Sequence, residues 1–220
     1  MRGWLGLLLV LLPAWVPAAE LSGHIDLTAE GKALRPEEAQ DAIVYFRPKQ
    51  ATQAAPITPP QSMSTVRKQF TPRVLATTVG SEIRFPNQDP ILHNAFSTSN
   101  KNAFDVGLYG QGDGQAVTFK DPGYVRVYCN VHHSMVGHIL VLDTPYFVRP
   151  DAAGNFSLKN LPAGEGDLVV WHERATPWHT VLDPAAAKPL TVPLELSQRR
   201  IAPHMNKFGK PYGRSSDGGY

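Results

Sequence analysis

Short apolar segments separated by proline and glycine run along the chain after its first stretch. Apolar and polar residues alternate within these segments, and helical periodicity is nearly absent. Such alternation, bounded by turn-forming residues, is typical of β-strands. The predicted strands are residues 42–46, 64–70, 74–79, 81–85, 117–119, 124–128, 137–142 and 167–171. With 20 prolines and 18 glycines in 220 residues, the sequence predicts an all-β protein.

Two changes in this pattern suggest how the chain is organised. Residues 50–61 are rich in alanine, proline and threonine, as expected of a loop or linker. Beyond Asp143 the segments carry no recognisable chemistry, although strand and turn signals continue. The one helix-like stretch, residues 35–40, is short. The length suits one large domain or two small β domains.

The first residues have the pattern of an export signal. Arg2 precedes an apolar run at 4–15, and Ala18 and Ala19 are small residues suited to cleavage. This run is too short to favour a membrane-spanning helix, and an uncleaved N-terminal anchor is the alternative. We therefore expect residues 1–19 to be a signal peptide and the mature protein to be periplasmic, with no transmembrane span.

Charge points to no strongly charged partner. The formal net charge is +2, and basic residues gather only near the C-terminus. Because residues 198–220 are also rich in glycine and serine, a flexible, solvated tail is expected there and not a nucleic-acid contact.

Cys129 is the only cysteine. In an exported protein an odd cysteine forms an intermolecular bond, is reactive, or binds metal, and a buried inert thiol is the plain alternative. His132 and Met135 follow it closely, and His93 lies upstream. Two imidazoles, one thiolate and one thioether make the ligand set of a blue-copper centre. We expect a hairpin turn carrying Cys129, His132 and Met135 to face a loop carrying His93, and to hold one type 1 copper ion.

Several of these segments resemble the cupredoxin family, most closely plastocyanin and amicyanin. The resemblance covers about residues 63–143 and rests on residues 70–72, 79–80, 83–87, 93–94, 127–129, His132, Met135 and Gly137. It implies a Greek-key β-sandwich with copper ligands His93, Cys129, His132 and axial Met135. It also implies that Asn94 ties the two ligand loops together.

The sequence departs from the family at two positions. Asn130 stands where many members have serine or threonine, which puts the bond to Asn94 in doubt. The doubled His132-His133 leaves two possible registers, of which spacing favours His132. The family also docks partners through an apolar patch, which residues 90–92 and Val136 would supply here.

The whole chain also resembles periplasmic methylamine-utilisation-type proteins. Residues 152–171 and 21–46 are similar to a carboxypeptidase regulatory-like β-sandwich. We therefore expect N-terminal strands and a proline-rich linker at 20–61 and a cupredoxin domain at 62–143. A second sandwich is expected at 144–197, possibly completed by 20–48.

These expectations favour a one-electron carrier that is not an enzyme and has no catalytic residue. Its partner would be a periplasmic dehydrogenase or c-type cytochrome reached through His132. Copper carriage or storage is the alternative, supported if His24, His172 or the pair His204-Met205 bound metal, although they are expected at the surface. A thiol enzyme with Cys129 as nucleophile lacks an orienting carboxylate. An adhesive surface around Trp171 and Trp178 is less favoured than core packing.

Overall fold

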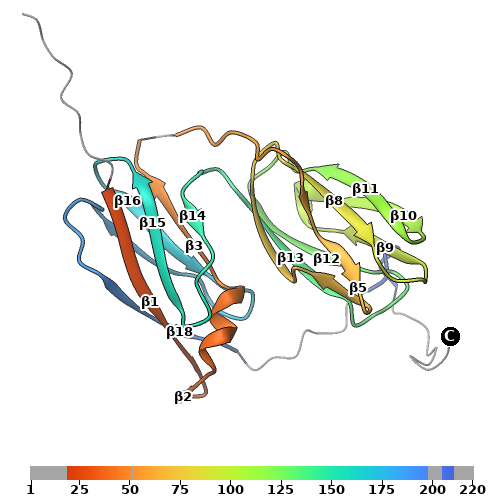
Figure 1. Ribbon diagram of the computed structural model, residues 1–220, viewed down its shortest axis with the longest axis horizontal. Helices are drawn as coiled ribbons and strands as arrows, with labels where there is room; N and C mark the ends of the chain where they lie inside the picture. Colours follow the sequence, from red (N-terminus) through yellow and green to blue (C-terminus); the bar gives the residue numbers. More distant parts are fainter. Residues whose placement is uncertain (1–18, 51, 198–204, 211–220) are drawn as a thin grey trace, which may run out of the picture.

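The computed structural model describes residues 19–50, 52–197 and 205–210 (Figure 1). Residues 1–18 of the expected signal peptide lie outside the described residues. Strands make up nearly all the regular structure, and the described helices are the short 3-10 turns η1 (Pro36–Asp41) and η2 (Asn100–Asn102). The predicted all-β class is therefore confirmed. None of the described helices is both long and apolar enough to cross a membrane.

Two sheets enclose the core that holds Cys129, and we call them the cysteine unit. The first sheet has the order β10 (Phe104–Tyr109), β9 (His93–Ser97), β12 (Gly123–Tyr128), β13 (Val136–Leu142) and β7 (Val74–Thr78). The second has the order β11 (Gly112–Thr118), β8 (Glu82–Asn87), β5 (Ser64–Val66) and β6 (Gln69–Thr71), with β4 (Gln61–Ser62) against β8. Phe85, Phe119 and Val127 are among the buried residues between them.

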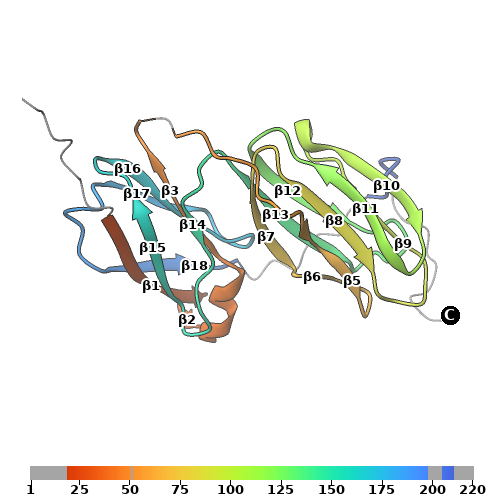
Figure 2. The ribbon, with the colours of Figure 1, turned by 45° about the horizontal axis from the view of Figure 1, so that its top comes forward.

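Two further sheets form a flanking unit beside the cysteine unit (Figure 2). One has the order β15 (Asn155–Leu161), β1 (Ala19–Ala29) and β18 (Leu190–Glu195), with β2 (Lys32–Ala33) against β1. The other has the order β14 (Phe147–Val148), β3 (Ile43–Pro48), β16 (Gly166–Trp171) and β17 (Trp178–Leu182). Early and late strands meet here, because β1 pairs in parallel with β18. The domain boundaries expected from the sequence stay a prediction.

Apolar side chains join the two units. Tyr45 and Trp171, from β3 and β16, belong to the same buried cluster as Val74 and Leu140, from β7 and β13. All seven residues of β13 are buried. This strand therefore packs against the core of its own unit on one face and against the flanking unit on the other, which explains the apolar run from Ile139 to Leu142.

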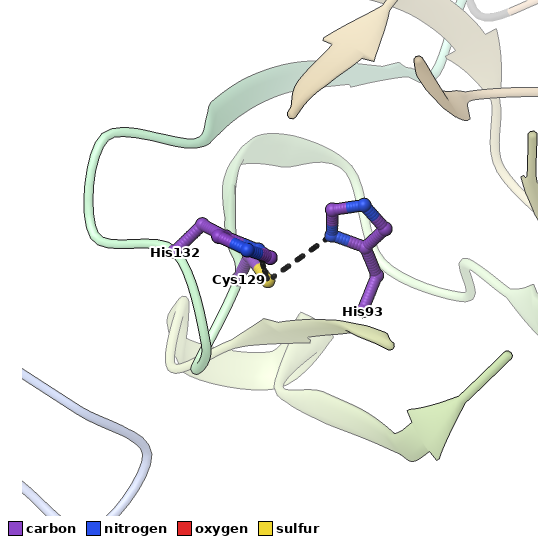
Figure 3. A group of neighbouring side chains, drawn as sticks. All are labelled: His93, Cys129 and His132. Atoms are coloured by element: carbon purple, nitrogen blue, oxygen red, sulfur yellow. Dashed lines mark hydrogen bonds between the residues drawn. The ribbon is translucent and has the colours of Figure 1, made fainter. Parts of the chain in front are cut away.

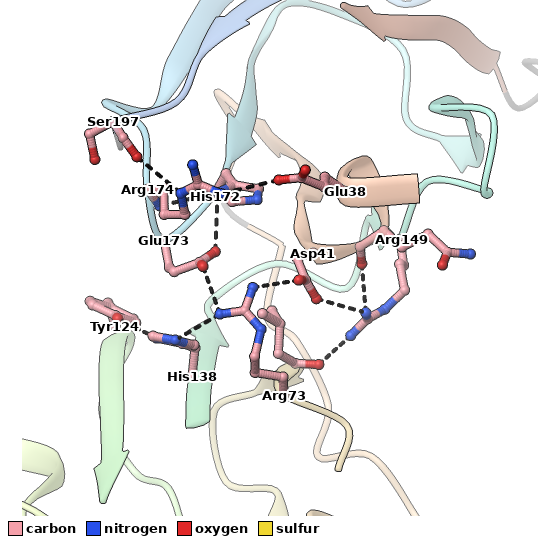
Figure 4. Close-up of polar contacts among 12 residues, drawn as sticks. Glu38, Asp41, Arg73, Tyr124, His138, Arg149, His172, Glu173, Arg174 and Ser197 are labelled. Carbon is pink, nitrogen blue, oxygen red and sulfur yellow. Dashed lines mark hydrogen bonds and ion pairs between the residues drawn. The ribbon is translucent and has the colours of Figure 1, made fainter. Parts of the chain in front are cut away.

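A group of ionisable residues lies at the same junction, and we call Asp41, Arg73, His138, His172 and Glu173 the charged seam (Figure 4). The guanidinium of Arg73 binds the carboxylates of Asp41 and, at 2.7 Å, Glu173. The prediction that His172 lies at the surface is wrong, because this residue is only 2% exposed. Burial lowers the pKa of His138 to about 4. The negative charge of Glu173 raises this pKa, and the positive charge of Arg73 lowers it further.

Two sequence predictions fail locally. Residues 64–70 were expected to be one strand, but Arg67 and Lys68, at φ of 50° and 57°, form the turn of a hairpin between β5 and β6. The apolar alternation in fact breaks here, at three consecutive polar residues, Arg67, Lys68 and Gln69, but no glycine or proline marks the turn. His93 was expected in a loop, yet it is the first residue of β9. All five residues of β9 are buried, so this strand lacks the alternation by which strands were predicted.

Candidate metal centre

Three side chains meet at one end of the cysteine unit (Figure 3). His93 begins β9, Cys129 directly follows β12, and His132 lies in the loop before β13. The Cys129 Sγ lies 3.8 Å from the Nδ1 of His93 and 3.9 Å from the Nδ1 of His132. All the donor atoms lie within 4.8 Å of one another.

These distances suit a shared metal ion. Nitrogen and sulfur donors bind such metals at about 2.0–2.3 Å, so two donors of one ion stand roughly 3.5–4 Å apart. His93 and Cys129 are fully buried, and His132 is half-buried. The rings of the two histidines lie 4.8 Å apart with an interplanar angle of 51°. The donor set therefore has a closed inner side and one ligand that reaches towards solvent.

Backbone hydrogen bonds close the 129–135 loop and bring Met135 back to Cys129. The amide of Cys129 donates to the carbonyl of Met135 at 3.4 Å, and the amide of Met135 donates to the carbonyl of His132 at 3.1 Å. The Met135 side chain is 1% exposed and belongs to the same buried cluster as Cys129. The short spacing therefore closes a tight loop, with the thiol and the thioether at its two ends.

A carboxylate orients His93. Its Nε2 lies 2.9 Å from Oδ2 of Asp89. The same carboxylate accepts the backbone amide of Arg67 on Oδ1 at 2.6 Å and that of Lys68 on Oδ2 at 2.8 Å. Burial raises the pKa of Asp89, but these hydrogen bonds outweigh it and hold the pKa below its ordinary value. A carboxylate can only accept here, so Nε2 of His93 donates to Asp89 and Nδ1 is the ring nitrogen that faces Cys129.

Asp89 is a site residue that the sequence reasoning missed. It lies four positions before His93, and a carboxylate at that distance from a candidate ligand was the available signal. Asn87 fixes the intervening chain, because its Oδ1 accepts the amide of Asp89 at 2.9 Å and its Nδ2 donates to the carbonyl of Ile91 at 2.8 Å. The histidine is thus held in position by its own segment.

Asn94 lies between the two ligand-bearing segments. Its Oδ1 accepts the amide of Asn130 at 3.3 Å, and its Nδ2 donates at 2.8 Å to both the carboxylate of Asp105 and the carbonyl of Gly107. The bond that was in doubt uses the backbone of Asn130, so it does not depend on a serine or threonine hydroxyl there.

The surface near the site differs from the sequence expectation. Val136 is buried, with 8% exposure, so the prediction that it contributes to an apolar surface patch is wrong. Leu92 is 55% exposed, and Leu108 and Val131, which the sequence reasoning did not single out, are 62% and 41% exposed. Leu108 pairs in register with Asn94. Of the two adjacent histidines, His132 is the one whose Nδ1 faces Cys129.

No family model and no curated protein matches the chain. Among solved structures, it is similar to a purple cupredoxin from Nitrosopumilus maritimus, with 21% identity over 37% of this chain and 99% of that one, at a TM-score of 0.34. It is similar to a reduced amicyanin mutant, with 17% identity over 45% and 98% and a TM-score of 0.36. It is also similar to a copper-containing nitrite reductase from Thermus scotoductus SA-01, with 24% identity over 55% of this chain, 28% of that chain and a TM-score of 0.38. What this chain binds has to follow from its own donor atoms.

Proposed function

We propose that the chain binds one copper ion as a type 1 centre, through Nδ1 of His93, Sγ of Cys129 and Nδ1 of His132, with Met135 as a weak axial ligand. The convergence of one buried sulfur and two imidazole nitrogens carries this proposal. Thiolate favours Cu(I), imidazole accepts both oxidation states, and no carboxylate belongs to this donor cluster to favour a hard cation.

The same arrangement supports one-electron transfer as the function. Copper would supply the redox change, and the chain keeps its ligands fixed while the charge changes. Asp89 holds His93, and the closed 129–135 loop holds Cys129 and Met135. Little rearrangement is then needed between the two states. We propose no catalytic role.

The half-buried His132 is the proposed point of electron exchange. His93 and Cys129 are fully buried, so a partner meets the site through the loop that carries His132. The exposed Leu92 and Val131 would give that partner an apolar contact surface. We propose a periplasmic redox protein, such as a dehydrogenase or a c-type cytochrome, as the partner of the exported protein.

The optical and EPR spectra of the protein after Cu(II) addition test this function. An intense visible copper–thiolate band with narrow copper hyperfine splitting, reversibly bleached by reduction, is expected. The Cys129→Ser variant is the control and should lose the band. A protein that binds only Cu(I) and remains colourless would support copper carriage or storage in place of electron transfer, and one that binds no copper would refute both.

A further inference from the structure

A closed ring of hydrogen bonds links the segment 205–210 to both ligand-bearing segments. The Nζ of Lys207 donates to Oδ2 of Asp105 at 2.7 Å, and Oδ1 of the same carboxylate accepts from Nδ2 of Asn94 at 2.8 Å. Oδ1 of Asn94 accepts the amide of Asn130 at 3.3 Å. The ring closes where Oδ1 of Asn130 accepts the amide of Lys207 at 3.2 Å.

The position of this ring relates it to the metal centre. Asn94 directly follows His93, and Asn130 directly follows Cys129. Lys207 lies far along the chain, beyond the last strand of the flanking unit, yet its segment returns to lie beside β10 (Figure 2). A residue from outside the cysteine unit therefore contacts the neighbours of two candidate ligands.

The returning segment has its own internal structure, so Lys207 is not held by a single contact. The side-chain oxygen of Asn206 accepts the amides of Phe208 at 3.0 Å and Lys210 at 3.1 Å. The amide of Asn206 donates to the carbonyl of Lys210 at 2.9 Å. This turn presents both the backbone amide and the ammonium group of Lys207 to the cysteine unit.

The ring also accounts for the unusual residue after the cysteine. The side chain of a serine or threonine at position 130 would be shorter than that of Asn130, whose side-chain oxygen accepts the backbone amide of Lys207. Asp105 is suited to the opposite side of the ring. Partial burial raises its pKa, but hydrogen bonds from Lys207, Gly107 and Asn94 keep the pKa below its ordinary value.

We propose that Lys207 is a positioning residue that fastens the His93 segment to the Cys129 loop and so slows opening of the metal centre. This inference rests on the proposed copper function only for its consequence, which is slower release of the ion. Its structural part concerns the chain alone: loss of the Lys207–Asp105 contact loosens the Asn94–Asn130 bond because the four groups act as one network.

Amide hydrogen exchange of the metal-free, full-length protein tests the structural part. The probe is the amide of Asn130, with the amide of Ile139 in β13 as an internal reference. Lys207→Met keeps the aliphatic stem and removes the ammonium group, and Asp105→Asn removes the charge from the other side. Each should speed exchange at Asn130 roughly two- to fivefold, as expected for a partly exposed ion pair, and leave Ile139 unchanged.

Lys210→Met is the matched control. Lys210 belongs to the same turn, and its Nζ forms no hydrogen bond or ion pair with any residue the structure describes. This variant should exchange like the wild type. The double variant Lys207→Met/Asp105→Asn should exchange no faster than the single variants, because both remove one shared contact. Wild-type exchange at Asn130 in both single variants, or an equal acceleration in Lys210→Met, would overturn the proposal.

A copper arm separates this inference from the proposed function. Transfer of Cu(I) from the loaded protein to excess bathocuproine disulfonate should be faster in Lys207→Met than in Lys210→Met, by about the factor seen in exchange. If the wild type binds no copper but the exchange result holds, the copper function fails and the fastening role of Lys207 stands. If copper binds and the exchange and transfer rates are unchanged, the fastening role fails alone.

Discussion

The metal centre and the charged seam both contain buried histidines beside carboxylates, but only at the metal centre do several donor atoms of described residues converge. At the metal centre, Nε2 of His93 is held by Asp89 and Nδ1 faces a thiol. In the seam, Nδ1 of His138 lies 2.6 Å from the hydroxyl of Tyr124, and its Nε2 lies 3.4 Å from the guanidinium of Arg73. Both nitrogens of that ring already have protein partners.

The two sites differ in the group that lies next to the second ring nitrogen, which is Nδ1 of His93 and Nε2 of His138. Arg73 is a permanent cation that binds Asp41 and Glu173 and lies 3.4 Å from Nε2 of His138, so a metal ion at that nitrogen would meet a positive charge. At the metal centre the corresponding position is taken by sulfur, which is a soft ligand. A buried histidine with a carboxylate neighbour is therefore a sign of a metal site only when its other nitrogen faces another ligand.

Exchanging histidine for glutamine at each place should give the largest contrast. His93→Gln is expected to abolish the copper–thiolate band, because an amide replaces an imidazole ligand. His138→Gln should keep the band at wild-type intensity. Copper titration followed by absorption measures both, and equal loss in the two variants would refute the distinction between the sites.

Removing the cation of the seam should be the next largest effect. In Arg73→Met, Asp41 and Glu173 lose their shared partner, and Glu173 is only 4% exposed. Breaking a pair of which one partner is buried should lower the free energy of unfolding by about 2–3 kcal/mol. Urea denaturation of the metal-free protein measures this. The copper band should survive in the folded variant, whereas its loss would show that the seam also shapes the metal centre.

The seam should also make stability depend on pH. The pKa of His138 is lowered to about 4 from 6.5, so the folded protein binds fewer protons than the unfolded chain between these values. Stability should therefore rise with pH across this window and fall as the pH drops from 6.5 towards 4. At pH 5 the loss relative to pH 7.5 is about 2 kcal/mol. Denaturation of the metal-free wild type should show the slope, and His138→Gln should show a smaller one.

The smallest effect is expected from Asp89, whose carboxylate acts on the reduction potential only through His93. Asp89→Asn keeps a hydrogen-bond acceptor for Nε2 but removes the negative charge that favours Cu(II). The reduction potential should rise by about 50 mV, which corresponds to roughly 1 kcal/mol for one electron. Voltammetry measures this against Asp113→Asn, a variant of an exposed aspartate in β11. An unchanged or lower potential would contradict the proposed role of Asp89.

The sequence predicted features that depend on residues close together in the chain, namely the strands and the ligand loop. Alternation indicated the all-β class, and the spacing from Cys129 to Met135 describes one closed loop whose backbone bonds the structure contains. The hairpin turn at 67–68 was missed because Arg67 and Lys68 are not typical turn residues, although the apolar alternation breaks there.

Contacts between distant residues left no comparable signal. Lys207 and Asn130 are 77 positions apart, and nothing near either one indicates that they meet. His172 was expected at the surface because a single histidine in a strand-rich segment carries no mark of burial, and its burial depends on packing between the two units. Burial of Val136 likewise depends on the sheet that contains β13.

The parallel pairing of β1 with β18 has a consequence for how the chain acquires its shape. Gly23 in β1 stands opposite Leu190 in β18, so this ladder joins residues separated by most of the chain. Closing so long a loop is slow, and topologies dominated by such pairings fold slowly. The cysteine unit draws all its strands from residues 61–142 and can assemble without waiting for that closure. The cysteine unit would therefore be the early folding part of the protein, and the flanking unit the part that completes it.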